Sequence, residues 1–289
     1  MQYLNKFIII LLKNNYFYLI YNQENKKIFM SNIITLIPVR MKATRLPNKP
    51  LLDVNGKTIL QRVCENVKKY ITGDVYVAGG DIEIIEACKE YGVPAILTDA
   101  SLPSGTDRIA SALKQIDPDG KKYDIVVNFQ GDGINVDPRV NLPLIEMIKK
   151  GDCDIATCGM IFKTKEDADN PTNVKIVMGL RDNEKEGRAL YFTRASNCPF
   201  TRDVNKIKNQ DLYHHIGIYV YTADALRKMV SLPLGVLEER ESLEQLRALE
   251  NGMTIKARII TQEEMKLNQD APADVNTPEE LEKARKYIK

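Results

Sequence analysis

IITLIPVRMKATRLPNKPLL, residues 33–52, decides the fold because an apolar run ends directly in a loop rich in cations. Residues 33–39 have the composition of a strand buried on both faces. Pro47 and Pro50 exclude a helix from the loop that follows. That loop carries four cations, Arg40, Lys42, Arg45 and Lys49. They repel one another unless water solvates them or a strongly anionic ligand neutralises them.

Strand-like and helical segments alternate from residue 33 onward. Helical spacing covers 57–70 and 81–91, and β-rich runs cover 74–78, 94–97 and 124–130. This alternation predicts a parallel sheet wrapped by helices, with ligands at the carboxyl ends of its strands.

The second half of the chain continues the α/β pattern. We expect helices around 223–230 and 236–250, and strands near 154–162, 173–178, 188–193, 215–221 and 254–260. A capping box, Thr277 with Glu280, predicts a last helix over 277–287.

Composition restricts the classes of function. The chain has 289 residues, 44% of them hydrophobic, and a net charge of +2, which argues against a nucleic-acid binder. Its five cysteines are scattered without a CxxC pair, which indicates reduced thiols in a cytoplasmic protein. No segment approaches the roughly 18 apolar residues of a membrane span, so we expect no membrane association.

The first 29 residues differ from the rest of the chain. The apolar run at 7–12 is interrupted by Lys13 and Asn14, and no small-residue cleavage site follows it. We interpret residues 1–29 as an N-terminal extension, either disordered or produced by a misassigned start before Met30. Residues 30–289 then form the functional domain.

Two further motifs follow predicted strands or open helices. NFQGDG, residues 128–133, places Asp132 at a strand tip beside two glycines, where it can bind magnesium together with substrate phosphates. The alternative is an Asp in an ordinary glycine-flanked turn. SGTDR, residues 104–108, offers free backbone N–H groups and Arg108 to an anionic or carbonyl ligand, although such a segment can also be only a helix cap.

The order of the motifs is more specific than any one of them. Seven stretches resemble the CMP-Kdo synthetases (3-deoxy-manno-octulosonate cytidylyltransferases; Kdo is the sugar acid): LIPVRMKATRLPNKPLL, SGTDRIA, VVNFQGD, YFTRA, HHIGIYVY, LEQLRALENG and VNTPEELEKA. The resemblance runs from about residue 33 to residue 288. It implies an α/β, Rossmann-like nucleotidyltransferase fold with a mixed, mostly parallel sheet and helices on both faces.

The same resemblance implies an activity. CTP and Kdo are converted to CMP-Kdo and pyrophosphate for lipopolysaccharide synthesis, with Mg2+ as cofactor. It also implies a homodimer, with a dimerisation subregion within about 160–250. The alternatives are activation of another 2-keto-3-deoxy sugar acid, such as 8-amino-Kdo or sialic acid, and a non-catalytic nucleotide-sugar-binding homologue.

The resemblance also assigns residues. Arg40, Arg45 and Lys49 are expected to bind the triphosphate, and Arg108 with Gln130 the nucleotide and the edge of the sugar site. Asp132 and Asn276 are the expected metal ligands, with Lys49, Arg45 and Asp132 central to catalysis. The residues expected around the sugar acid are Arg194, His215, Tyr219, Glu244 and Gln245. Each has an ordinary alternative, such as a satisfied core histidine for His215 or a solvated helix face for Glu244.

Three departures from the family pattern stand out. Gly133 and Ile134 follow Asp132 where an acidic residue and a proline are common. Gly79 and Gly80 replace side chains near the nucleotide. Asn276 replaces an aspartate that ligates magnesium, so we expect weaker metal binding in similar geometry, with Asp274 able to compensate.

Overall fold

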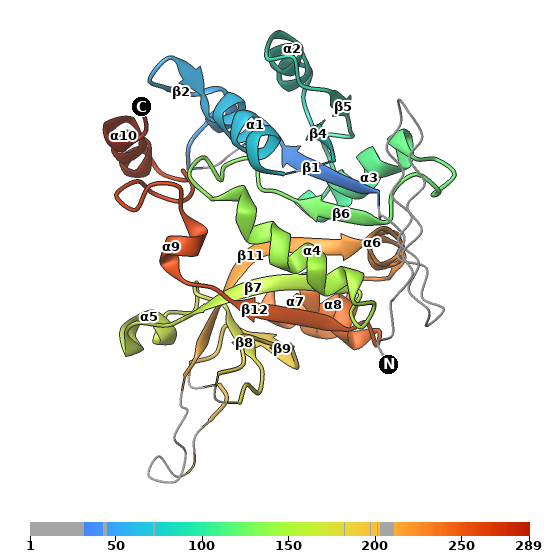
Figure 1. Cartoon of the computed structure of the whole chain (residues 1–289), viewed down its shortest axis with the longest axis vertical. Helices are drawn as coiled ribbons and strands as arrows, with labels where there is room; N and C mark the ends of the chain where they lie inside the picture. Colours follow the sequence, from blue (N-terminus) through green and yellow to red (C-terminus); the bar gives the residue numbers. More distant parts are fainter. Residues whose placement is uncertain are drawn as a thin grey trace, which may run out of the picture.

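The computed structural model places most of the chain from residue 32 to the C-terminus (Figure 1). The described residues are 32–42, 45–71, 73–181, 183–196, 198–200, 202 and 211–289. The extension predicted for residues 1–29 lies outside them.

The elements alternate as predicted in the first half. The strands are β1 (Ile33–Val39), β2 (Asp53–Val54), β3 (Lys57–Thr58), β4 (Asp74–Gly79), β5 (Ala95–Leu97), β6 (Ile125–Asn128), β7 (Ile155–Ile161), β8 (Lys175–Val177), β9 (Glu186–Arg188), β10 (Tyr191–Thr193), β11 (Tyr213–Thr222) and β12 (Ile255–Ile259). The helices are α1 (Ile59–Tyr70), α2 (Ile82–Glu90), α3 (Gly105–Ile116), α4 (Asn141–Lys149), α5 (Lys165–Asp169), α6 (Ala223–Ser231), α7 (Val236–Glu241), α8 (Gln245–Glu250), α9 (Gln262–Met265) and α10 (Pro278–Tyr287), with the short 3-10 helices η1 (Lys49–Leu51) and η2 (Pro138–Val140).

One mixed sheet organises the molecule. Its main strand order is β5-β4-β1-β6-β11-β7-β12-β9, and β8 pairs with both β11 and β10. The four strands β5, β4, β1 and β6 are parallel to their neighbours, as are β7 and β12. Strand β11 runs antiparallel between β6 and β7. The predicted mixed, mostly parallel α/β fold is confirmed.

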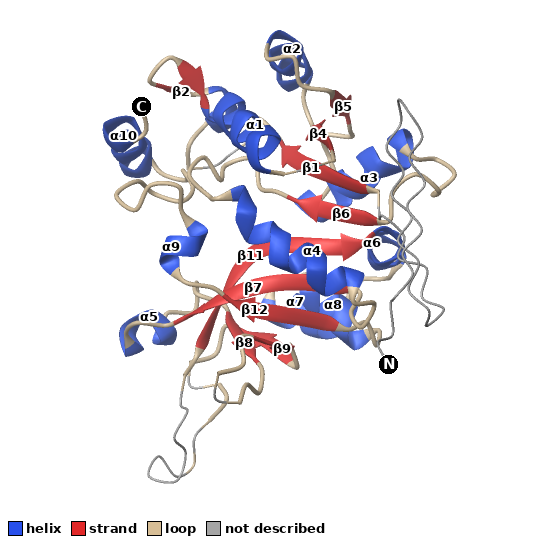
Figure 2. Cartoon of the chain, in the orientation of Figure 1, coloured by secondary structure: helices blue, strands red, loops and turns tan. Residues whose placement is uncertain are grey.

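Helices cover both faces of the sheet, as Figure 2 shows. Alternate residues of β1 point to opposite faces, so Ile37 and Val39 enter one core and Ile34 and Leu36 the other. The first core is completed by residues of α1, α2, α4 and α10, and the second by residues of α3, α6 and α8. Burial on both faces explains the continuous apolar composition of β1. None of the helices in the described part of the chain has the length and apolar character needed to span a bilayer.

Two expectations for the second half were wrong in detail. The helix expected at 236–250 is two helices, α7 and α8, because Ser242 adopts a left-handed conformation with φ 52° and interrupts it. The strand expected at 188–193 is divided between β9 and β10, because β9 pairs with β12 whereas β10 pairs with β8. The capping box on α10 is confirmed. The Thr277 hydroxyl accepts from the backbone N–H of Glu280, and the Glu280 carboxylate accepts from the backbone N–H of Thr277.

The topology collects chemical groups at one edge of the sheet. The parallel strands β1, β4, β5 and β6 present their carboxyl ends together, and the chain leaves them at Arg40, Gly80, Thr98 and Phe129. The cationic loop after β1 and the NFQGDG segment after β6 therefore meet.

Candidate functional site

A cavity of about 560 Å³ opens at this edge, and we call it the basic cavity. It contains every residue expected to bind nucleotide or metal: Arg40, Arg45, Lys49, Arg108, Gln130, Asp132 and Asn276. Lys42, Ser104 and Gly105 line it as well. Arg40, Lys42 and Arg45 are exposed there. Like-charged side chains around one cavity favour an anionic ligand over a neutral one.

Lys49 lies at the centre of the polar contacts in the basic cavity. Its ammonium donates to Asp132 Oδ2 at 2.7 Å and to Asn276 Oδ1 at 2.9 Å. Asn48 has φ 56° and begins η1, so the left-handed turn sets the direction from which Lys49 approaches. The Lys49 and Asp132 side chains are only 16% and 28% exposed, so solvent screens this pair less than a surface ion pair.

Asn276 is held on both sides. Its backbone N–H donates to the Glu280 carboxylate at 2.6 Å, and its side-chain Nδ2 donates to Asp274 Oδ2 at 2.7 Å. This second bond directs Oδ1 toward Lys49. Desolvation, and then the nearby charge of Asp132, raises the pKa of the Asp274 carboxyl. In this structure Asp274 therefore acts on the site by orienting Asn276.

Arg108 is the most buried cation of the cavity, at 2% exposed. Its Nη1 donates to Thr98 Oγ1 at 2.7 Å and to the Asp99 carbonyl at 3.2 Å. Its Nη2 is buried and has no hydrogen-bond partner among the described residues. A guanidinium donor left unpaired inside a cavity is costly unless a ligand accepts from it. Burial, and then the charge of Arg40, lowers the Arg108 pKa.

Gly80 makes room for this arginine. A Cβ added at Gly80 would lie 2.5 Å from Arg108 Nη1, and one added at Gly79 would lie 2.9 Å from Ile85 Cδ1. A larger residue at position 80 would move the guanidinium, so the two glycines that depart from the expected motif are required by local packing. The sequence alone shows that Gly80 departs from the family motif. The reason for the departure is Arg108, which is 28 positions further along the chain.

The five residues expected around the sugar acid do not line the basic cavity. They lie in or beside a second, buried cluster. His215 and Tyr219 of β11 form an aromatic row with Phe192 and Tyr221, with neighbouring ring centroids 5.0 to 5.8 Å apart. Burial lowers the His215 pKa to about 3, so the imidazole is neutral. Its Nε2 lies 3.2 Å from Thr157 Oγ1.

Glu244 is the N-cap residue of α8, and Gln245 is the first residue of that helix. Thr106 donates to Glu244 Oε1 at 2.6 Å, and Thr106 follows Gly105, which lines the basic cavity. Glu244 therefore connects the buried cluster to the cavity through α3. Burial raises the Glu244 pKa. Gln245 is 3% exposed, and its Nε2 has no partner within the described chain.

Arg194 lies directly after β10. Its Nε donates to the Glu241 carbonyl at 2.7 Å, and its backbone N–H donates to the Glu241 carboxylate at 2.8 Å. Its Nη2 reaches the Ser242 carbonyl at 3.3 Å. Arg194 thus fastens the turn between α7 and α8, the turn that leads into Glu244.

Three polar residues beside these two sites were not predicted. Thr106, Asn128 and Tyr221 are buried at the junction between the basic cavity and the buried cluster. Asn128 Oδ1 has no hydrogen-bond partner among the residues described. Asn128 was quoted only as part of a motif; a polar residue inside the otherwise apolar run 125–129 was the signal that could have identified it.

Comparisons with known proteins agree with this geometry. A cytidylyltransferase family profile matches residues 34–255. The 3-deoxy-manno-octulosonate cytidylyltransferase of Paramagnetospirillum magneticum is 41% identical over 89% of this chain and 97% of the relative. That of Chelativorans sp. is 42% identical over 90% of this chain and 97% of its own length. The chain belongs to the 3-deoxy-manno-octulosonate cytidylyltransferase family.

A solved member of this cytidylyltransferase family has the same fold. The structure of CMP:2-keto-3-deoxy-manno-octonic acid synthetase complexed with CTP superposes with a TM-score of 0.76 and 32% identity, covering 89% of this chain and 98% of that one. The carboxyl-end cavity is thus part of a cytidylyltransferase fold whose solved relative was obtained with CTP.

The donor set of this family member suits a divalent metal. Asp132 Oδ2 and Asn276 Oδ1 converge within 2.9 Å of one nitrogen, so a cation is already stabilised at that point. No group of three or more His, Cys, Asp or Glu side chains with metal-binding geometry occurs in the described ranges. Two protein oxygens, one of them charged, form a donor set that would hold a divalent metal ion such as Mg2+.

Proposed function

We propose that the chain transfers the CMP group of CTP to Kdo, giving CMP-Kdo and pyrophosphate. The observation that supports this most strongly is the convergence of Lys49, Asp132 and Asn276 inside a cationic cavity at the carboxyl ends of parallel strands. A nucleoside triphosphate carries about four negative charges, which the basic cavity is built to neutralise. Membership of the family supplies the substrate class.

In this proposal the cationic loop binds the phosphates that leave. Arg40, Arg45 and Lys49 contact the β- and γ-phosphates and stabilise the charge of the departing pyrophosphate. Arg108 and Gln130 contact the rest of the nucleotide, and the unpaired Arg108 Nη2 donates to an oxygen of the ligand. Asp132 and Asn276 would hold Mg2+, which supplies charge neutralisation for the triphosphate when bound.

The reaction is an in-line displacement. The anomeric 2-hydroxyl of Kdo attacks the α-phosphorus of CTP and loses its proton to solvent, and the bond from that phosphorus to the bridging oxygen breaks to release pyrophosphate. The side chains act by positioning both substrates and by cancelling charge, so no nucleophilic residue is needed.

The sugar acid would bind between the basic cavity and the buried cluster. Arg194 is suited to its carboxylate, for which it must exchange part of its carbonyl contacts. The ring hydroxyls of the sugar would be bound by Glu244, Gln245 and Tyr219. The neutral imidazole of His215, also on β11, packs against the Tyr219 ring. The unpaired Gln245 Nε2 is a donor available to a hydroxyl oxygen.

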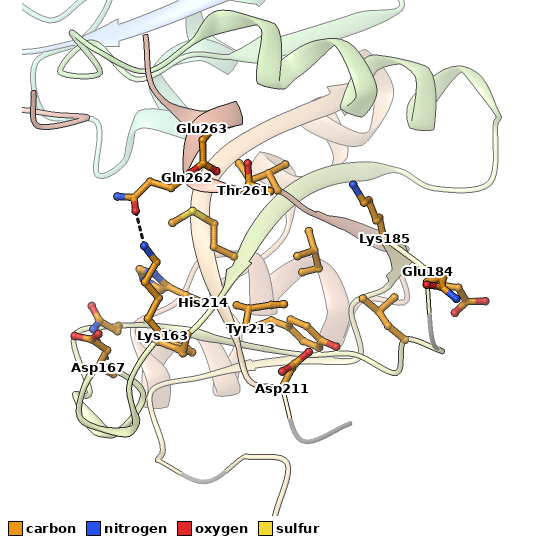
Figure 3. Close-up of a pocket in the computed structure, with 18 of the residues that line it drawn as sticks. Lys163, Asp167, Glu184, Lys185, Asp211, Tyr213, His214, Thr261, Gln262 and Glu263 are labelled. Carbon is orange, nitrogen blue, oxygen red and sulfur yellow. Dashed lines mark hydrogen bonds between the residues drawn. The ribbon is translucent and has the colours of Figure 1, made fainter. Parts of the chain in front are cut away.

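We further infer a homodimer formed through the 160–250 subregion. A cavity of about 1270 Å³ lies there. Figure 3 shows its lining side chains, which come from β7, β11 and the segment after β12. Lys163 and Lys185 lie on it together with Asp167 and Glu184, so a two-fold related copy can meet opposite charges. Ile161, one of the residues that line it, is 48% exposed. We expect Ile161→Asp to convert a dimer to a monomer in light scattering; a monomeric wild type would contradict this inference.

The test of the activity is pyrophosphate release with a panel of sugar acids. The full chain is given CTP and Mg2+ with Kdo, 8-amino-Kdo or N-acetylneuraminate. We expect turnover with Kdo in preference to the other two. A folded protein that releases no pyrophosphate with any of them would overturn the proposal.

We also propose a cytoplasmic location for the protein. The proposed substrates fit that location, and so do the five unpaired cysteines, four of them buried.

A further inference from the structure

The two expected metal ligands come from distant parts of the chain, and their spacing must be fixed by something other than regular structure. Asp132 lies in the loop after β6, whereas Asn276 is the last residue but one of the connector 266–277 between α9 and α10. That connector contains neither helix nor strand apart from one isolated bridge, Lys266 to Val136. Its conformation therefore depends on individual hydrogen bonds to its neighbours.

Asn135 supplies more of those bonds than any other described residue. Its side-chain Nδ2 donates to the carbonyls of Asn268 at 2.7 Å and Ala271 at 3.2 Å, and its Oδ1 accepts from the Asn268 N–H at 2.9 Å. Its backbone N–H donates to the Ala273 carbonyl and its own carbonyl accepts from Leu267, both at 3.0 Å. One residue thus makes five hydrogen bonds to the connector.

The arrangement links both ligands. Asn135 is three positions after Asp132, and its last contact, Ala273, is three positions before Asn276. Between these points the Val275 N–H donates to the Asp132 carbonyl at 3.3 Å. Asn135 is 2% exposed, so none of its bonds is readily replaced by water. A buried amide whose donors and acceptor are all used by one connector defines that connector's path.

We infer that Asn135 is a positioning residue for the metal site, which sets the distance between Asp132 and Asn276 without contacting substrate. The inference rests on the proposed function, because the metal belongs to that reaction. It deepens the proposal by naming the residue that makes the two halves of the site one unit. Partners that orient metal ligands typically change metal affinity by about 10- to 100-fold when removed.

The test compares two buried asparagines. Asn135→Ala removes the three side-chain bonds to the connector, whereas Asn141→Ala removes an equally buried asparagine that donates only to the Pro138 carbonyl. Binding of Mn2+ to each protein in the presence of CTP is measured by electron paramagnetic resonance, which needs no turnover. We expect affinity roughly 10-fold lower in Asn135→Ala, and unchanged in Asn141→Ala, while KM for Kdo stays the same in both.

Equal Mn2+ affinity in wild type and Asn135→Ala would overturn the inference. If Asn135→Ala does not fold, Asn135→Ser decides in its place: it keeps a small polar group but cannot donate to both the Asn268 and Ala271 carbonyls, and it should still bind Mn2+ more weakly than wild type. Failure of the wild type to release pyrophosphate would instead sink the proposed function, so the two failures are distinguishable.

Discussion

The ammonium of Lys49 lies 2.7 Å from Asp132 and 2.9 Å from Asn276, between the two residues expected to bind metal. The cation that should bind phosphate therefore occupies the point at which both oxygens converge. In the proposed reaction Lys49 would contact the phosphates, and Asp132 and Asn276 would hold the metal ion. A divalent ion would then replace a single positive charge at that point, which suits the added negative charge of the triphosphate.

Removing Lys49 tests this arrangement. Lys49→Ala should lower kcat/KM for CTP by roughly 100- to 1,000-fold, because a donor to the charge developing on pyrophosphate is lost. Lys57→Ala, which breaks an exposed pair with Glu65, is the matched control and should retain normal kinetics. Near-normal turnover by Lys49→Ala would remove it from the site.

Asn276→Asp should strengthen metal binding. A second carboxylate adds charge to the pair of oxygens, so the Mg2+ concentration for half-maximal activity should fall several-fold. Without metal, the new carboxylate lies beside Asp132 and Asp274 and should lower the melting temperature. Asn251→Asp adds the same charge at an exposed position outside the cavity and should leave the Mg2+ titration unchanged. An unchanged Mg2+ titration in Asn276→Asp would argue that this position is not a ligand.

Gly80→Ala should displace Arg108. Its new Cβ would meet Nη1 at 2.5 Å, so we expect a loss of about 1–3 kcal/mol in the free energy of unfolding and a higher KM for CTP. Gly179→Ala, where the Cβ would meet nothing within 4 Å, controls for the loss of backbone freedom. Both quantities come from urea titration and initial rates; a Gly80→Ala variant that behaves like Gly179→Ala would contradict the packing argument.

Acid should destabilise the fold through His215. Its pKa is lowered from 6.5 to about 3 by burial, so the unfolded chain binds the proton more tightly than the folded one. This stabilisation is complete above pH 6.5 and is lost as the pH falls toward 3, by up to about 1.4 kcal/mol for each pH unit. Unfolding free energies at pH 7, 6 and 5 should therefore fall less steeply in His215→Gln than in wild type. An equal pH dependence of the unfolding free energy in the two proteins would mean that folding does not lower the pKa of His215.

The sequence was sufficient to predict the site residues whose position follows from the order and direction of the strands. Arg40 and Asp132 each follow a parallel strand, and the carboxyl ends of such strands share one edge, so their meeting could be predicted. The division of 236–250 at Ser242 could not, because no residue there marks a break and the left-handed turn is stabilised by distant contacts with Arg194. The roles of Gly80 and Asn135 were also invisible, since each depends on a partner distant in the chain.

The most direct test of the central claim is phosphorus NMR of the full chain with CTP, Kdo and Mg2+, run beside Asp132→Ala. We predict that wild type converts the three CTP signals to one CMP-Kdo signal and one pyrophosphate signal in equal molar amounts, and that Asp132→Ala does so at least 100-fold more slowly, the loss typical of a key electrostatic group. Unchanged CTP signals with folded wild type, or equal rates in the two proteins, would contradict the account.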